Sequence, residues 1–197
     1  MAPSLRELAK VDGYNQPNQK VVAFMVRQME EHLAKLKRVT EGLTPAQLEW
    51  QIQTGHNTIG MLLAHCAVAE AYWVCVFDTG MPLEPDGASK VAEVVGIGWD
   101  DDGLPAKPGS THPDTLRGKT LADYYGYLDR TRAASHKVMR SWTDDKLLTT
   151  VIRGEKETSM AWVMYHVHEH LVEHCGQIQY IKHLMRDAGV LPPLHES

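Results

Sequence analysis

The chain has 197 residues, of which 43% are hydrophobic, and its 20 basic and 25 acidic side chains give a formal net charge of -5. This length predicts a single domain, residues 1–197, with a sizeable core. The charges are interspersed and form no basic stripe, so nucleic acid is excluded as an expected partner. No stretch has the roughly 18 uninterrupted apolar residues of a membrane span, and the N-terminus lacks a signal segment. We therefore expect a cytoplasmic protein without a membrane partner.

The three cysteines, Cys66, Cys75 and Cys175, are an odd number without paired spacing. A disulfide framework is therefore not expected, and a reducing compartment fits this composition. Each cysteine is predicted to be a small buried hydrophobic residue.

The first two predicted helices precede a long irregular segment. Residues 21–39 carry apolar side chains every three or four positions, the period of an amphipathic helix, and Gly42 ends that helix. The second helix begins at Asn57 or Thr58, either of which can accept a free backbone N–H group, and continues to about Phe77. It is apolar over most of its circumference, so we expect it to be deeply buried.

Residues 79–119 form the long crossover that follows, with five of the ten prolines and seven of the fifteen glycines. This composition predicts at most a short helix around 90–95. Loops of this length inside a domain are often functional, for example as lids over a site. The alternative is a mobile decoration on the surface.

Two further helices complete the prediction. The third covers about 120–142, and a β-branched run before Gly154 predicts a short extended piece. Thr158 or Ser159 then opens the fourth helix, which ends at Asp187 before a glycine and a proline. Four long helices with one long crossover between the second and third predict an all-α four-helix bundle.

The fourth helix contains HVHEHLVEH at 166–174, with four histidines and two glutamates in nine positions. His166, His170 and His174 are spaced by four residues, so they lie along one stripe that Gln177 continues. Two histidines at this spacing can direct ring nitrogens at one point, as in helical metal sites. Three span about 12 Å of helix, so a single ion is not expected to bind all three.

A third ligand is expected from the buried second helix. His65 lies in its middle, and a lone histidine on an apolar face must find a partner. Bundle cores build metal sites from facing helices. His168 lies off the stripe, and Glu169 and Glu173 are rotated from it by roughly 100°. Taken alone, His65 could be a core histidine that bonds a backbone carbonyl, and His170 and His174 could belong to a polar helix face. Considered jointly, the histidines of the two helices favour a metal site.

Two more specific metal-site motifs match or approach this pattern, but the sequence lacks the other residues that each requires. The stretch also matches the H-x-x-E-H pattern of inverted zinc peptidases, but those enzymes need an acidic ligand well downstream and only 23 residues follow His174. A carboxylate-bridged di-iron bundle needs Glu-x-x-His on two helices, and no glutamate in this chain has a histidine three residues later.

Two segments, NTIGMLLAHCAVAEAYW at 57–73 and WVMYHVHEHLVEHCGQI at 162–178, resemble the DinB/YfiT superfamily of small four-helix metalloproteins. By that resemblance His65, His170 and His174 match the three metal ligands of the family. In the commonest form of the family motif an arginine precedes the Gly-Gln pair, whereas this chain has Cys175 at that position. His166 matches a histidine of some branches and is kept as a reserve or supporting residue.

The resemblance implies a divalent metal ion, most often nickel or zinc, and a homodimer. Some branches resemble thiol transferases that join bacillithiol, mycothiol or glutathione to an electrophile. We therefore predict a metal-dependent thiol S-transferase with a small-molecule thiol and an electrophile as substrates, in which Gln177, Tyr165 or the crossover positions the thiol.

The alternatives are a metal-dependent hydrolase that uses water in the same open position, and a non-catalytic, metal-stabilised stress or binding protein. The second is disfavoured because structural zinc sites usually close with a fourth protein ligand, and the sequence offers no obvious one.

Overall fold

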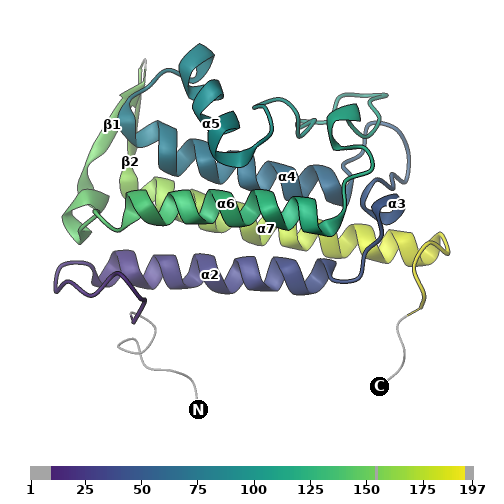
Figure 1. Cartoon of the computed structure of the whole chain (residues 1–197), viewed down its shortest axis with the longest axis horizontal. Coiled ribbons are helices and arrows are strands. Elements are labelled where there is room, and N and C mark those ends of the chain that lie inside the picture. The colour runs from purple at the N-terminus through teal and green to yellow at the C-terminus, as the bar shows by residue number, and fades with distance from the viewer. Residues whose placement is uncertain (1–9, 154, 194–197) are drawn as a thin grey trace.

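The computed structural model describes residues 10–153 and 155–193, and the described chain is mostly helical. Its helices and strands are α2 (Lys20–Thr40), α3 (Pro45–Leu48), α4 (Ile59–Glu70), α5 (Ala88–Val95), α6 (Leu121–Met139), α7 (Met160–Asp187), β1 (Thr150–Arg153) and β2 (Lys156–Ser159). The long helices α2, α4, α6 and α7 lie alongside one another, and α4 and α7 run in opposite directions (Figure 1).

The four long helices begin within a few residues of their predicted positions, and the N-cap side chains of α4, α6 and α7 each accept a backbone N–H of the first turn. The hydroxyl of Thr58 accepts the backbone N–H of Met61 at 3.0 Å, and that of Ser159 accepts the N–H of Trp162 at 3.2 Å. Each bond satisfies one of the free donors in the first turn of a helix. Thr58 and Ser159 are therefore the caps of α4 and α7, out of the two candidates that the sequence offers for each.

Helix α4 is the core of the molecule. Every residue of α4 except His65 is buried. A Cβ atom at Gly60 would lie 2.4 Å from the hydroxyl oxygen of Tyr124, so glycine is what lets α4 approach α6 this closely. Residues Ile59–Thr79 are long and apolar enough to cross a membrane, but 78% of the apolar window is buried inside the fold, as in the core helix of a soluble protein.

A π-helical stretch, Ala71–Val76, and a 3₁₀ turn, Phe77–Thr79, extend α4 to the predicted end of the second helix. The crossover then forms a further π-type turn and α5, and it lies on the side of α4 opposite α2 (Figure 1). It is not a loose decoration, because Val91, Val95 and Leu116 are fully buried in the main core cluster.

The extended piece expected before α7 is a two-stranded antiparallel hairpin. Thr150 pairs with Ser159 and Arg153 pairs with Lys156. The hairpin lies at the end of the molecule where α7 begins (Figure 1).

A buried ion pair joins α4 to α6. Arg132 donates to both carboxylate oxygens of Glu70 at 2.8 Å, and it donates to Glu30 of α2 at 2.8 Å. The side chains of Arg132 and Glu70 are 6% and 4% exposed. Arg132 therefore joins α6 to both α4 and α2, and the two carboxylate oxygens of Glu70 are taken up by this pair instead of supporting a metal ligand.

Candidate metal centre

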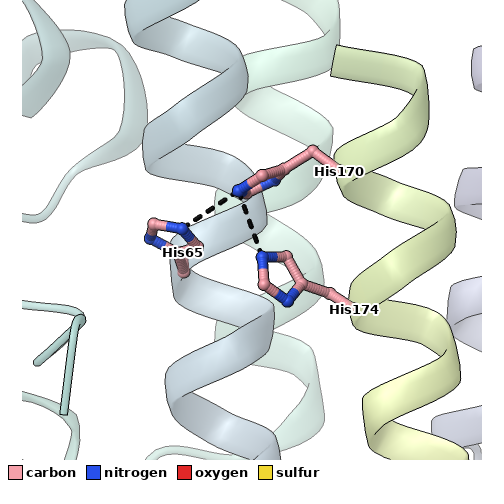
Figure 2. A group of neighbouring side chains, drawn as sticks. All are labelled: His65, His170 and His174. Atoms are coloured by element: carbon pink, nitrogen blue, oxygen red, sulfur yellow. Dashed lines mark hydrogen bonds between the residues drawn. The ribbon is translucent and has the colours of Figure 1, made fainter. Parts of the chain in front are cut away.

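Three histidine side chains converge between α4 and α7. His65 extends from α4, and His170 and His174 extend from α7, so that their rings point toward one another (Figure 2). Nε2 of His170 lies 3.0 Å from Nε2 of His65 and 3.1 Å from Nε2 of His174. All three ligand atoms lie within 4.8 Å of one another, close enough to hold one metal ion.

The crossover supplies a carboxylate to His65. Nδ1 of His65 lies 2.8 Å from Oδ2 of Asp102, whose side chain is 3% exposed. The other oxygen, Oδ1, accepts the backbone N–H of Leu104 at 2.9 Å. This local bond is that of an Asx turn, and Gly103 between the two residues has the positive φ of 73° that glycine adopts readily. The turn thereby fixes the carboxylate against the imidazole.

Gln177 has the corresponding role for His174. Its Oε1 lies 3.1 Å from Nδ1 of His174, one helical turn away on the same face of α7. Carboxylate and amide oxygens only accept, so Nδ1 of both His65 and His174 carries the proton and donates it. In the neutral form of each ring, Nε2 is then unprotonated, and it faces His170.

Burial keeps the central histidine neutral. The pKa of His170 is lowered to about 2, first by burial and then by the nearby His174 and His65. Burial also lowers the pKa of His174, against the hydrogen bond that His174 donates to Gln177, which raises it. A neutral imidazole is the form that binds a metal ion.

The three Nε2 atoms are better placed to bind a cation than to form hydrogen bonds with one another. His170 can donate at most one N–H from Nε2, whereas two unprotonated nitrogens face it. Nitrogens bound to one tetrahedral zinc ion at roughly 2.0–2.1 Å lie about 3.3 Å apart, close to the two separations found between the rings. A divalent ion would satisfy all three lone pairs, so the residues fit the metal that the sequence predicts.

The family model described as the DinB superfamily matches residues 28–178, a span that includes all three histidines and Asp102. The chain belongs to the DinB superfamily. A crystal structure of a DinB-like protein from Bacillus cereus ATCC 10987 has a similar fold, with a TM-score of 0.55 and 18% identity over 89% of this chain and 97% of that one. None of the curated proteins matches the sequence.

Membership in the DinB superfamily confirms the resemblance seen in the sequence, and the structure separates the histidines of the HVHEHLVEH stretch. His166 stacks on Trp162 with ring centroids 4.6 Å apart, and its own centroid is 5.7 Å from that of His170. His168 lies edge-on to His32 of α2 at 4.6 Å, against the neighbouring helix. Only the last two histidines of the stretch join the group of three that could hold an ion.

The hydroxyl of Tyr165, another residue proposed to position substrate, donates to Glu169 at 2.9 Å, and the side chain is half exposed. Cys66, Cys75 and Cys175 are free and buried, as predicted.

Sequence reasoning missed Asp102. Its only local signal is the run Asp100–Asp102 in a loop rich in glycine and proline. Such a run is more typical of a solvated turn than of a buried partner for a histidine. The contact joins residues 37 positions apart, so it depends on the path of the crossover, which no local pattern encodes.

Proposed function

We propose that this DinB-superfamily protein is a metal-dependent enzyme that transfers a low-molecular-weight thiol to an electrophile. His65, His170 and His174 would hold the ion, most simply nickel or zinc, in a single domain built on the bundle of α2, α4, α6 and α7. The observation that carries this proposal is the convergence of three imidazole nitrogens, two of them on rings whose other nitrogen donates to a hydrogen-bonding partner.

When bound to three neutral ligands, a divalent ion keeps its full charge and open positions, and it can hold a thiol as the thiolate at neutral pH. In the overall reaction a sulfur–carbon bond forms while the bond from carbon to the leaving group breaks. The thiol proton passes to solvent, and the leaving group departs with the bonding electron pair.

The residues of the chain hold the site in place for this reaction. Asp102 orients the His65 ring and Gln177 orients the His174 ring, so neither ring must reorganise when the ion binds. His65, with 27% of its side chain exposed, leaves the centre open to a small molecule on one side. These features support an open catalytic site in preference to a closed structural one.

Elemental analysis of protein purified without a metal-affinity column tests the ion. We expect close to one divalent ion per chain in the wild type and in His183→Ala, which removes an exposed histidine of the same helix outside the cluster. His65→Ala and His170→Ala should each lose most of the bound metal. Equal metal content in all four proteins would refute the assignment.

A conjugation assay tests the reaction. Metal-loaded protein is mixed with bacillithiol, mycothiol or glutathione and a generic electrophile, and the thioether is measured by mass spectrometry. The expected result is conjugation above the uncatalysed rate with at least one thiol, lost in His170→Ala and kept in His183→Ala. Absence of conjugation with all three thiols would refute the proposal, and a product that gains water without thiol would indicate hydrolysis instead.

A further inference from the structure

An apolar cavity of about 410 Å³ opens between α7 and the segment that precedes α4. Trp50 and Ile52 line it from that segment, and Ile181 and Leu184 line it from α7. Its volume lies in the range of small-molecule pockets, and its walls are mostly hydrophobic, as such pockets usually are.

Two side chains at this cavity are more exposed than their chemistry favours. Ile52 is 49% exposed and Tyr180 is 64% exposed, and both line the cavity. Large apolar side chains that gather around a concave surface mark a binding site more often than isolated ones do. Among the described residues that line the cavity, none is lysine, arginine, aspartate or glutamate.

The cavity adjoins the metal centre through one residue. Gln177 lines the cavity, and its Oε1 is the hydrogen-bond partner of His174. Ile181 and Leu184 follow Gln177 at helical spacing, so the stripe of α7 that carries the histidines continues directly into the cavity wall. A ligand in the cavity would therefore lie within about two helical turns, roughly 11 Å, of His174 along α7.

We propose that this cavity binds the apolar part of an uncharged organic electrophile and presents its reactive carbon to the histidine centre. The role of the ligand as an electrophile rests on the proposed function, whereas its chemistry rests on the cavity alone. The lack of charged side chains in the wall favours an uncharged group, because a buried ion would have no partner there. The polar groups of the wall, those of His56, Asn57 and Gln177, can orient it.

A binding titration with the uncharged fluorescent probe 1-N-phenylnaphthylamine tests the cavity without any turnover. Wild-type protein should give a saturable rise in fluorescence. Ile52→Asp and Tyr180→Asp place a carboxylate at the cavity rim on well-exposed positions, and each should weaken probe binding at least tenfold. The matched control is Ile152→Asp, the same substitution at a residue that is 71% exposed on β1, and it should bind the probe as the wild type does.

Equal probe binding in Ile52→Asp and Ile152→Asp would overturn the proposal, because the probe would then lie elsewhere. So would a dimeric wild type that binds no probe and becomes monomeric in Ile52→Asp by sedimentation velocity, because a second copy would then cover the cavity.

Steady-state kinetics test the electrophile role separately. Ile52→Asp should raise KM at least tenfold for the apolar electrophile 1-chloro-2,4-dinitrobenzene and leave KM for small, polar iodoacetamide unchanged. An equal rise for both electrophiles, or for neither, would overturn the assignment. If no thiol is conjugated at all, the proposed function and the electrophile role both fail, while the probe titration still decides whether the cavity binds an uncharged apolar ligand.

Discussion

Replacing Asp102 by asparagine should weaken metal binding while leaving the fold intact. The change removes the negative charge and keeps one oxygen, which can accept from Nδ1 of His65 over the 2.8 Å contact of the structure, while the amide NH2 replaces the oxygen that accepts the backbone N–H of Leu104. Loss of such a supporting carboxylate typically costs about 10- to 100-fold in metal affinity. We expect the lower end for asparagine, a tenfold loss worth about 1.4 kcal/mol.

Asp102→Ala should cost more. It removes both the bond to His65 and the acceptor for the backbone N–H of Leu104, so the turn and the imidazole both lose their anchor. An affinity loss near 100-fold, about 2.7 kcal/mol, is expected. The two variants therefore form a graded series: asparagine removes the charge and one of the two accepted hydrogen bonds, and alanine removes both bonds.

Competition for zinc against a chromogenic chelator measures these affinities directly. Asp100→Asn is the matched control, because it makes the same change two positions away at an exposed residue. It should bind zinc within twofold of the wild type. If Asp102→Asn and Asp102→Ala also stay within twofold, Asp102 does not support the metal ligand and the reasoning is refuted.

Three further predictions concern stability, each measured by urea unfolding of the apo protein. Glu70→Ala should lose about 3 kcal/mol, because it removes two of the hydrogen bonds of the buried Arg132 guanidinium and leaves it with the partly exposed Glu30 as its carboxylate partner; a loss under 1 kcal/mol would mean that water reaches this pair. Burial raises the pKa of Glu30, but the hydrogen bond from a histidine and the charge of Arg132 outweigh it and lower the pKa to about 2 from the ordinary 4.5. The stability that this group contributes is complete above about pH 4.5 and is lost as the pH falls toward 2, so Glu30→Gln should flatten the acid limb of the stability profile, and an unchanged profile would contradict this. Gly60→Ala should destabilise the protein by about 1–3 kcal/mol, because the added Cβ would overlap the buried Tyr124. Gly176→Ala should stabilise the protein by roughly 0.5–1 kcal/mol, because its Cβ would meet no atom within 4 Å and alanine favours a helix over glycine. Effects of the same sign in the two variants would contradict this packing.

The long helices were predictable because their signals are local. Apolar spacing sets their faces, and a hydroxyl such as that of Thr58 or Ser159 marks where a helix can begin. The proximity of His170 and His174 could also be predicted, because residues four apart on a helix lie next to each other. That His65 faces them was inferred from its position in an apolar helix, and the structure brings the three together.

What could not be predicted depends on long-range packing. The π-helical stretch Ala71–Val76 continues the apolar run of α4 without a glycine or a proline, so no helix-breaking residue marks the switch in hydrogen bonding. The strands β1 and β2 have four residues each and bury only Thr158 between them, so no apolar face in the sequence marks their pairing. The burial of Arg132 depends on the carboxylate of Glu70 beside it, a contact that no local sequence pattern predicts.

If the three histidines bind an ion, the bond between Asp102 and His65 couples the crossover to that binding, and thermodynamic reciprocity then fixes the return effect. If the crossover strengthens binding of the ion tenfold, the ion must favour the docked crossover over its detached form by the same factor, about 1.4 kcal/mol. Residues 79–119 would then behave as a sensor of occupancy. Removal of the ion with a chelator should increase amide hydrogen exchange selectively in residues 79–119. The helices α2 and α6 should stay protected, because they carry neither a candidate metal ligand nor Asp102.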